Sequence, residues 1–214
     1  MTAGEPIAIP APPPSERVFL LSPANLSGTR AKQLISPRAT FDAAQRYRSP
    51  EGVPIALAFA FMSSLYFRGK IAYAQHFAER HNVFGITFGF GLVAPDWPMN
   101  EERLNVMART PVDAEARNYR KPLERDAQAV AERLAPDAHV VLLGSVATGK
   151  YVDILQPIFG PRLRFPAVFA GLGDMSRGGL LLRAVRENRE LQYVSLDAPR
   201  HRTGGGSGRI PDAW

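Results

Sequence analysis

The chain has 214 residues, of which 45% are hydrophobic and 21% charged, a composition ordinary for one globular domain with a real core. It contains no cysteine, which excludes disulfides, zinc–thiolate sites, iron–sulfur clusters and a cysteine nucleophile. The net charge of +6 favours an acidic partner such as nucleic acid or a nucleotide, although solubility explains the charge equally well.

The two ends of the chain differ in composition from its middle. Residues 1–15 are rich in proline and predict a flexible, extended arm, and residues 200–214 are rich in glycine and predict a flexible basic tail. Residues 16–199 are predicted to form a single α/β domain. No stretch reaches the ~18 apolar residues of a membrane helix, and the N-terminus lacks a signal-peptide pattern. We therefore expect a cytoplasmic protein with no membrane partner.

Short apolar runs alternate with helical patterns along this domain. Strands are predicted at 17–22, 83–89, 139–144, 163–169 and 191–196, with Pro166 marking an edge or a bend. Helices are predicted at 28–35, 55–80, 120–136 and 175–188, and a further helix is expected after residue 150. Residues 36–53 predict a loop and residues 90–98 a turn.

Three of these helices carry additional signals. The helix at 55–80 is expected to be interrupted near Arg68 and Gly69, and the glycine pair of the helix at 175–188 should let another backbone approach closely. In the helix at 120–136, Pro136 provides the end. One face of that helix is predicted to be apolar, with Leu123, Ala127, Val130, Ala131 and Leu134.

Strands separated by helices predict a three-layer α/β sandwich with a mostly parallel central sheet of about four to five strands. In such sheets ligands bind beyond the carboxyl ends of the strands. This rule selects the loops 22–28, 89–96 and 144–150, which are rich in small residues. We expect the functional site where these three loops meet.

The loop at 144–150 has the spacing G-x-x-x-x-G-K of a phosphate-binding P-loop. A true P-loop needs Ser or Thr after the lysine to coordinate Mg²⁺, and this chain has Tyr151 there. Asp197 is only a fair match for the second Mg²⁺ carboxylate. An NTP-binding protein is therefore the less favoured alternative, although the loop and the following helix N-terminus still suit an anion.

Several segments, taken in order, resemble the bacterial peroxide-stress YaaA family. They are "LLSPAN" (20–25), "GITFGFGLVAPDWPM" (85–99), "VVLLGSVATGKYVDIL" (140–155) and "GLGDMSRGGLLLRAV" (171–185). "LYFRGKIAYAQHF" (65–77) is similar to a related group of proteins of unknown function, and the accessory domain of archaeosine synthases shares the same order. The resemblance implies a fold like that of uracil-DNA glycosylases, a basic cleft and a DNA- or nucleobase-related role.

The chain departs from the family pattern at two positions. Asn25 stands where the family usually has Lys, and Phe90 stands where Tyr is typical. The water-activating Asp and the catalytic His motif of the glycosylases are not recognisable either, so uracil excision is not predicted.

Each candidate residue has a functional and a structural interpretation. Asp96 is a general base or a sugar-hydroxyl acceptor, or else a turn carboxylate. Arg177 is a phosphate ligand, or else the ion-pair partner of Asp174 or Asp96; Asp174 itself is expected to cap its helix. Tyr66, with Phe67 and Tyr73, alternates with cations in a pattern that suits base stacking, or else belongs to the core.

The predicted site combines these residues. Asp96 and Asn25 are the predicted catalytic residues, and the predicted substrate-binding residues are Ser22, Tyr66, Arg68, Lys70, Phe90, Ser145, Lys150, Tyr151, Asp174, Ser176 and Arg177. Ser22 is not predicted to be a hydrolase nucleophile, because no G-x-S-x-G elbow or positioned histidine accompanies it. The histidines His76, His81, His139 and His201 lack metal-ligand spacing, so neither a metal nor another cofactor is predicted.

The sequence thus predicts a nucleic-acid- or nucleotide-directed protein that acts in base modification, salvage or repair through a basic cleft. The alternative is a DNA-binding protein without catalytic activity, whose cleft and flexible ends contact only the backbone. Whether the protein is an enzyme is left open.

Overall fold

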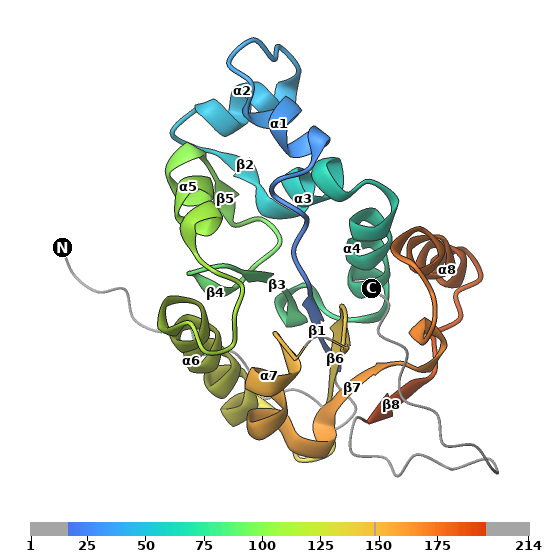
Figure 1. Ribbon diagram of the computed structural model, residues 1–214. Helices are drawn as coiled ribbons and strands as arrows, with labels where there is room; N and C mark the ends of the chain where they lie inside the picture. Colours follow the sequence, from blue (N-terminus) through green and yellow to red (C-terminus); the bar gives the residue numbers. More distant parts are fainter. Residues whose placement is uncertain (1–16, 148, 196–214) are drawn as a thin grey trace, which may run out of the picture.

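The structure is a computed structural model that describes residues 17–147 and 149–195. Figure 1 shows a central sheet with helices packed on both sides, so the predicted α/β sandwich is confirmed at this level. The predicted arm (1–15) and tail (200–214) lie outside the described residues. Within the described residues, no helix is both long and apolar enough to cross a membrane.

The sheet has six strands in the order β4-β3-β1-β6-β7-β8. Its four inner strands are β1 (Arg17–Leu21), β3 (Val83–Thr87), β6 (His139–Leu143) and β7 (Leu163–Pro166), and neighbouring inner strands are parallel. The edge strands β4 (Gly91–Val93) and β8 (Tyr193–Ser195) are antiparallel to their neighbours. The expected number of four to five strands was too low, because part of the predicted turn at 90–98 pairs with β3 as strand β4.

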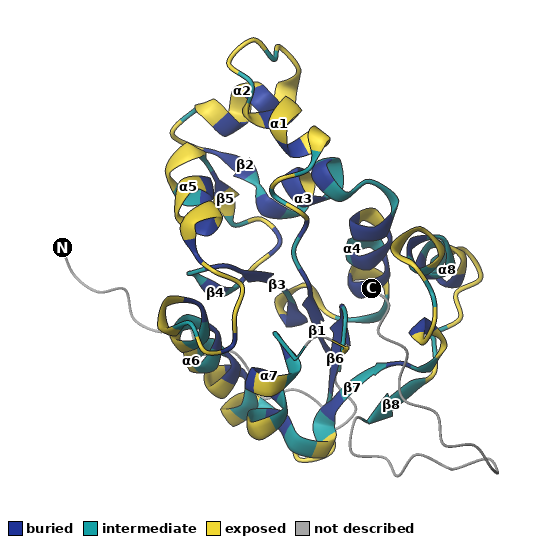
Figure 2. Cartoon of the chain, viewed as in Figure 1, coloured by how far each residue is buried: buried dark blue, intermediate teal, exposed yellow. Residues whose placement is uncertain are grey.

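The register of the parallel strands brings their carboxyl ends to one edge of the sheet. Leu21, at the end of β1, pairs with Leu143 of β6 on one side and with Gly85 of β3 on the other. β1 and β6 are the most buried strands and appear dark blue in Figure 2, because helices cover both of their faces.

Two helix pairs cover the sheet. α4 (Leu65–Phe77) and α8 (Asp174–Arg186) lie side by side on one face, and α6 (Arg117–Arg133) and α7 (Val152–Phe159) lie together on the other (Figure 1). Gly178 of α8 lies against Gly69 of α4 so closely that a Cβ atom at Gly178 would come within 2.8 Å of the Leu65 carbonyl oxygen. The predicted close approach is confirmed for Gly178, whereas Gly179 has open space around its Cβ position.

A smaller layer extends beyond the carboxyl ends of the strands. It consists of α1 (Thr29–Ile35), α2 (Asp42–Arg48), α3 (Ile55–Ser63), α5 (Glu101–Arg109) and the two-stranded ribbon of β2 (Val53–Pro54) and β5 (Pro98–Met99). Short 3₁₀ turns occur at Arg80–Asn82, Gly160–Arg162 and Ala167–Phe169. The predicted loop at 36–53 was wrong in part, since α2 forms within it and buries Ala44 and Tyr47.

The remaining differences are at element boundaries. The predicted interruption at Arg68 and Gly69 was wrong: both lie inside α4, and the break falls at Ser64, whose φ of 53° cannot continue a helix. α6 ends at Arg133 because Leu134 is already extended, and its predicted residues Leu123, Ala127 and Val130 are buried. The predicted strand at 163–169 stops at Pro166, from which a 3₁₀ turn continues.

Candidate functional site

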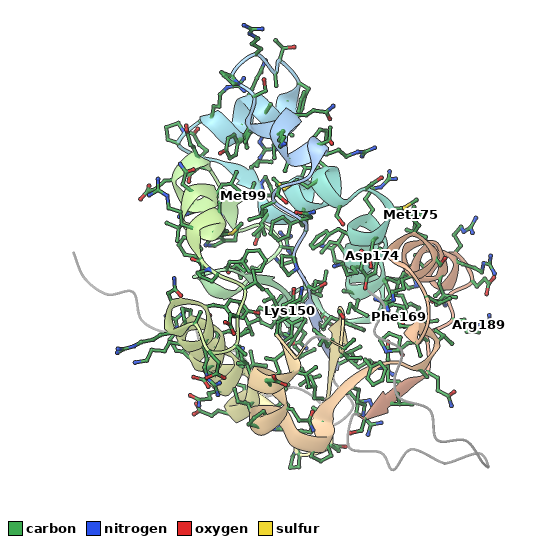
Figure 3. All side chains as sticks on the ribbon, in the orientation of Figure 1. Met99, Lys150, Phe169, Asp174, Met175 and Arg189 are labelled. Carbon is green, nitrogen blue, oxygen red and sulfur yellow. The ribbon has the colours of Figure 1, made fainter. Side chains whose placement is uncertain are left out.

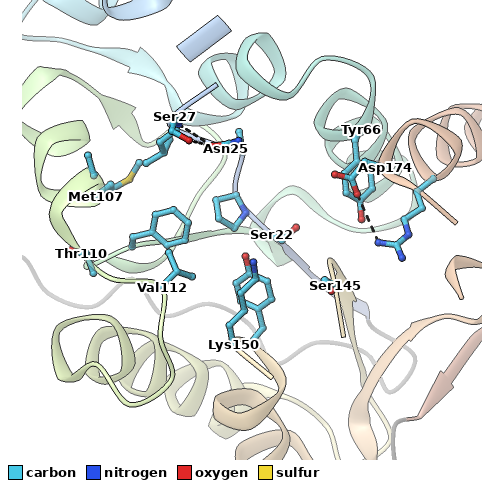
Figure 4. A pocket seen from close by; sticks show the side chains of 17 residues that line it. Ser22, Asn25, Ser27, Tyr66, Met107, Thr110, Val112, Ser145, Lys150 and Asp174 are labelled. Atoms are coloured by element: carbon cyan, nitrogen blue, oxygen red, sulfur yellow. Dashed lines mark hydrogen bonds and ion pairs between the residues drawn. The ribbon is translucent and has the colours of Figure 1, made fainter. Parts of the chain in front are cut away.

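A pocket of about 420 Å³ lies at the carboxyl ends of β1 and β6, where the sequence predicts the site. Figure 4 shows its wall from close by. The lining residues are Ser22, Pro23, Ala24, Asn25, Leu26, Ser27, Tyr66, Phe88, Met107, Ala108, Thr110, Val112, Ser145, Lys150, Tyr151, Asp174 and Arg177. The volume lies in the range of small-ligand sites.

The floor of the pocket contains a serine that is held by a buried lysine. Ser22 directly follows β1, and its backbone N–H still bonds to the Leu143 carbonyl of β6. Lys70 of α4 donates from Nζ to the Ser22 carbonyl oxygen at 2.6 Å and to Ser22 Oγ at 2.9 Å. The Lys70 side chain is 1% exposed and lies behind Ser22, which itself is 7% exposed and lines the pocket.

Burial makes Lys70 an unusual lysine. The ammonium lies over the ring of Tyr66 at 4.4 Å and over that of Phe67 at 4.9 Å. Desolvation lowers its pKa from 10.5 to about 7; the Asp174 carboxylate opposes this change and the Arg177 guanidinium adds to it. A pKa near neutrality therefore divides this amine between its protonated and its neutral form.

The start of α8 forms the second wall. Arg177 donates from Nε and Nη2 to the Phe169 carbonyl oxygen at 3.3 and 3.1 Å, and its Nη1 lies 3.9 Å from Oδ1 of Asp174. In Figure 3, Asp174 lies beside α4, at the start of α8. Asp174 does not cap the helix as expected: Gly173 occupies the N-cap, and Asp174 is the first helical residue, where its charge complements the helix dipole.

The loop between β6 and α7 forms the third wall. Gly144 passes so close to the end of β1 that a Cβ atom there would lie 2.8 Å from Ser22 Cβ. Lys150 lines the pocket, with its Nζ 5.2 Å from the Tyr151 ring centre, and its carbonyl accepts a hydrogen bond from the Tyr119 hydroxyl. Burial raises the pKa of the Tyr151 phenol well above its usual range, so Tyr151 stays neutral.

The opposite wall is mainly apolar and comes from a segment that the sequence did not indicate. Met107 of α5 and Val112 after it lie across the pocket from Tyr66 and Asp174 in Figure 4, and Phe88 and Ala108 also line this region. Residues 100–110 contain only an ordinary capped amphipathic helix. The one usable signal was the apolar pair Leu104 and Met107, which indicates a buried face but no ligand.

The structure brings together eight of the thirteen predicted site residues. They are Ser22, Asn25, Tyr66, Ser145, Lys150, Tyr151, Asp174 and Arg177. The eight come from the ends of β1 and β6, from the residues just before α7, and from the starts of α4 and α8. The site is therefore built from two of the three predicted loops.

The predicted catalytic role of Asp96 does not fit its position. Asp96 does not line the pocket, its side chain is 59% exposed, and it forms a surface ion pair with Arg80 at 2.8 Å. Asn25 lines the pocket, but its Oδ1 accepts hydrogen bonds from both the backbone N–H and the hydroxyl of Ser27. Asn25 thus fixes the turn after β1, as an Asx turn does.

Four predicted binding residues lie elsewhere. Arg68 and Ser176 are exposed and do not line the pocket, Phe90 packs on Trp97 with 5.1 Å between ring centres, and Lys70 lies behind Ser22. Tyr66 lines the pocket but is only 6% exposed, and Lys70 occupies one face of its ring. This burial favours the core interpretation of Tyr66 over base stacking.

No group of three or more His, Asp or Glu residues that could hold a metal ion occurs in the part of the chain that the structure describes. Asp197, the weak candidate for a Mg²⁺ ligand, lies outside that part. Comparisons of the chain with protein-family models, with curated proteins and with solved structures found no match. The resemblance to the YaaA family stays a prediction.

Proposed function

We propose that the protein is directed at nucleotides or nucleic acid and acts on a base in modification, salvage or repair. The observation that carries the proposal is the two-sided pocket at the strand ends. Lys150 and Arg177 provide cations, and Phe88, Met107 and Val112 provide an apolar wall. A nucleotide has the matching halves, because its phosphate suits cations and its base suits an apolar surface.

The resemblance of four segments to the YaaA family supports the same proposal, and with it a fold like that of uracil-DNA glycosylases. In this reading Lys150 and Arg177 hold the phosphate, and the serine hydroxyls of the pocket contact the sugar or the base. The net charge of +6 adds a long-range attraction for a phosphate-bearing partner.

The test is a titration of the full chain with fluorescent nucleoside monophosphates, single-stranded DNA and duplex DNA at several salt concentrations. Lys150→Ala should weaken binding about tenfold, since one phosphate contact is lost. Lys121→Ala is the matched control, because Lys121 is an exposed lysine of α6 outside the pocket. Equal nucleotide affinities of the wild type and Lys150→Ala would show that the phosphate does not bind at Lys150. If no probe binds even at low salt, the proposal is overturned.

The same titrations separate the two alternatives. A protein that only binds DNA should bind polymer with a steep salt dependence and ignore free nucleotides. An NTP-binding protein should require Mg²⁺ for binding. The proposed protein should bind a monophosphate without Mg²⁺.

A further inference from the structure

Ser22 and Lys70 are placed relative to one another as a nucleophilic hydroxyl and its general base are. Lys70 Nζ lies 2.9 Å from Ser22 Oγ, within the range for direct proton transfer. The second hydrogen bond, from Nζ to the Ser22 carbonyl at 2.6 Å, fixes the amine against the end of β1. Since Ser22 lines the pocket and the buried Lys70 does not, a ligand in the pocket meets Ser22 before it meets Lys70.

The surroundings of Lys70 favour a neutral amine, which is the form a base requires. No ion pair of Lys70 is found among the described residues; the charged groups that act on it are Asp174 and Arg177, both from α8. Their effects oppose one another, so burial between the rings of Tyr66 and Phe67 dominates. A pKa of about 7 leaves a large share of the amine unprotonated at physiological pH.

We propose that Ser22 is a nucleophile activated by Lys70 as general base, and that the pocket cleaves a small carboxylic ester through an acyl-serine. Serine–lysine pairs are a known variant of the serine–histidine arrangement, and they need no G-x-S-x-G turn. The inference goes beyond the proposed function, because it requires the pocket and the pair but no nucleotide.

The chemical steps balance without a further reactant except water. Neutral Lys70 takes the hydroxyl proton while Ser22 Oγ bonds to the carbonyl carbon of the ester. The tetrahedral intermediate collapses, the bond to the leaving alkoxide breaks, and Lys70 returns the proton to form the alcohol. A water molecule then attacks the acyl-serine in the same way and releases the carboxylic acid and free Ser22.

Other residues of the pocket have parts in this reaction. Lys150 and Ser22 both line the pocket (Figure 4), and in this proposal the Lys150 ammonium stabilises the developing oxyanion. The wall with Phe88, Met107 and Val112 suits the apolar part of an acyl chain.

A different use of Lys70, as a nucleophile that forms a Schiff base, fits the structure less well. Lys70 is 1% exposed and does not line the pocket, so a carbonyl ligand would have to displace Ser22 to reach Nζ. The geometry therefore assigns the nucleophilic atom to Ser22 and the proton transfer to Lys70.

The experiment is covalent labelling of the full-length protein with a fluorophosphonate probe, followed by intact-mass measurement and peptide mapping. The wild type should take up one probe, at Ser22, and Ser22→Ala should take up none. Lys70→Met should react about 100-fold more slowly, as expected for loss of a general base. Lys32→Met is the matched control, an exposed lysine of α1, and should react like the wild type.

The pH dependence of wild-type labelling tests the inference without any variant that could misfold. The rate should rise with pH around a midpoint of about 7, because only neutral Lys70 accepts the proton. No labelling of the wild type at pH 9, labelling at Ser27 or Ser145 in place of Ser22, or a rate independent of pH would overturn it.

A second measurement follows p-nitrophenyl butyrate, for which we expect a burst of one p-nitrophenol per chain. The absence of ester cleavage in a protein that labels at Ser22 would overturn the ester as substrate. Nucleotide binding and covalent labelling are measured separately on the wild type, so failure of the nucleotide proposal and failure of this one give different results.

Discussion

The ends of β1 and β3 are neighbours in the sheet, yet they have become very different regions. After β1 the chain goes straight into the turn around Ser22 and Asn25, and a lysine from α4 reaches this turn. After β3 the chain turns at Gly89, whose φ is 91°, and returns as β4. The end of β3 gives the pocket only the apolar side chain of Phe88.

A position beyond the carboxyl end of a parallel strand is therefore not sufficient to make a polar site. At the end of β1 the decisive partner comes from a helix packed on the sheet, so the polar groups are buried and fixed. Beyond β3, Asp96 finds its partner Arg80 on the surface, where water screens both charges. Mutations and changes of pH should therefore alter stability more at the end of β1, where the polar groups are buried, than beyond β3, where they are solvated.

The largest effect is expected from Gly178, which allows α8 to lie against α4 and so holds the wall next to Ser22. A Cβ atom at Gly178 would lie 2.8 Å from the Leu65 carbonyl oxygen and from Tyr66 Cα, both backbone atoms that cannot move separately. Gly178→Ala should lower the free energy of unfolding by about 3 kcal/mol, measured by urea denaturation.

Gly179→Ala is the matched control in the same helix. Nothing lies within 4 Å of its Cβ position, so replacing a helical glycine should raise stability by about 0.5 kcal/mol. Equal effects of the two substitutions would show that α4 and α8 are not in such close contact.

The next largest effect is a pH dependence of the free energy of unfolding that is caused by Lys70. Its pKa is about 7 in the folded protein and 10.5 when unperturbed, so between these values the unfolded chain binds more protons. Stability should therefore rise with pH, by about 1 kcal/mol per unit between pH 7.5 and 9.5. The measurement is urea denaturation of the wild type and Lys70→Met at several pH values; a wild-type slope retained in Lys70→Met would assign it to another group.

Much of the fold could be predicted because its signals are local. The apolar runs at 17–22 and 139–144 become buried parallel strands, and the ends of these strands form the pocket. The strand β4 was missed because its residues lie between glycines and a proline, in a composition typical of turns. Ser64 gave no sign of the helix break, since serine rarely adopts positive φ.

The site was harder to predict than the fold, because its key contact joins residues 48 positions apart. Ser22 and Lys70 were both candidates, but nothing local indicates that α4 places Lys70 behind the end of β1. The sequence offers Ser22 no positioned histidine, and the structure provides Lys70 as its partner. Asp96 had the residue type of a base and followed a predicted strand, but its exposure to solvent could not be predicted from the sequence.

A smaller effect is expected from Arg177, which joins α8 to the end of the turn at Phe169. Arg177 donates two hydrogen bonds to the Phe169 carbonyl, and its side chain is 19% exposed. Arg177→Lys keeps the charge but loses the planar pair of donors, so unfolding should become easier by about 1 kcal/mol. Arg183→Lys, farther along the same helix, should leave the urea midpoint unchanged.

The smallest effect is expected at the end of β3. The ion pair of Asp96 with Arg80 is solvated, since the two side chains are 59% and 74% exposed. Asp96→Asn should therefore change the free energy of unfolding by less than about 0.5 kcal/mol, and should leave both nucleotide binding and fluorophosphonate labelling as in the wild type. Urea denaturation, the nucleotide titration and the labelling rate measure these outcomes. A large loss in either assay would show that Asp96 takes part in the site, and the contrast between the two strand ends would then be wrong. A carboxylate outside the pocket could act there only after a rearrangement of the loop that follows β4.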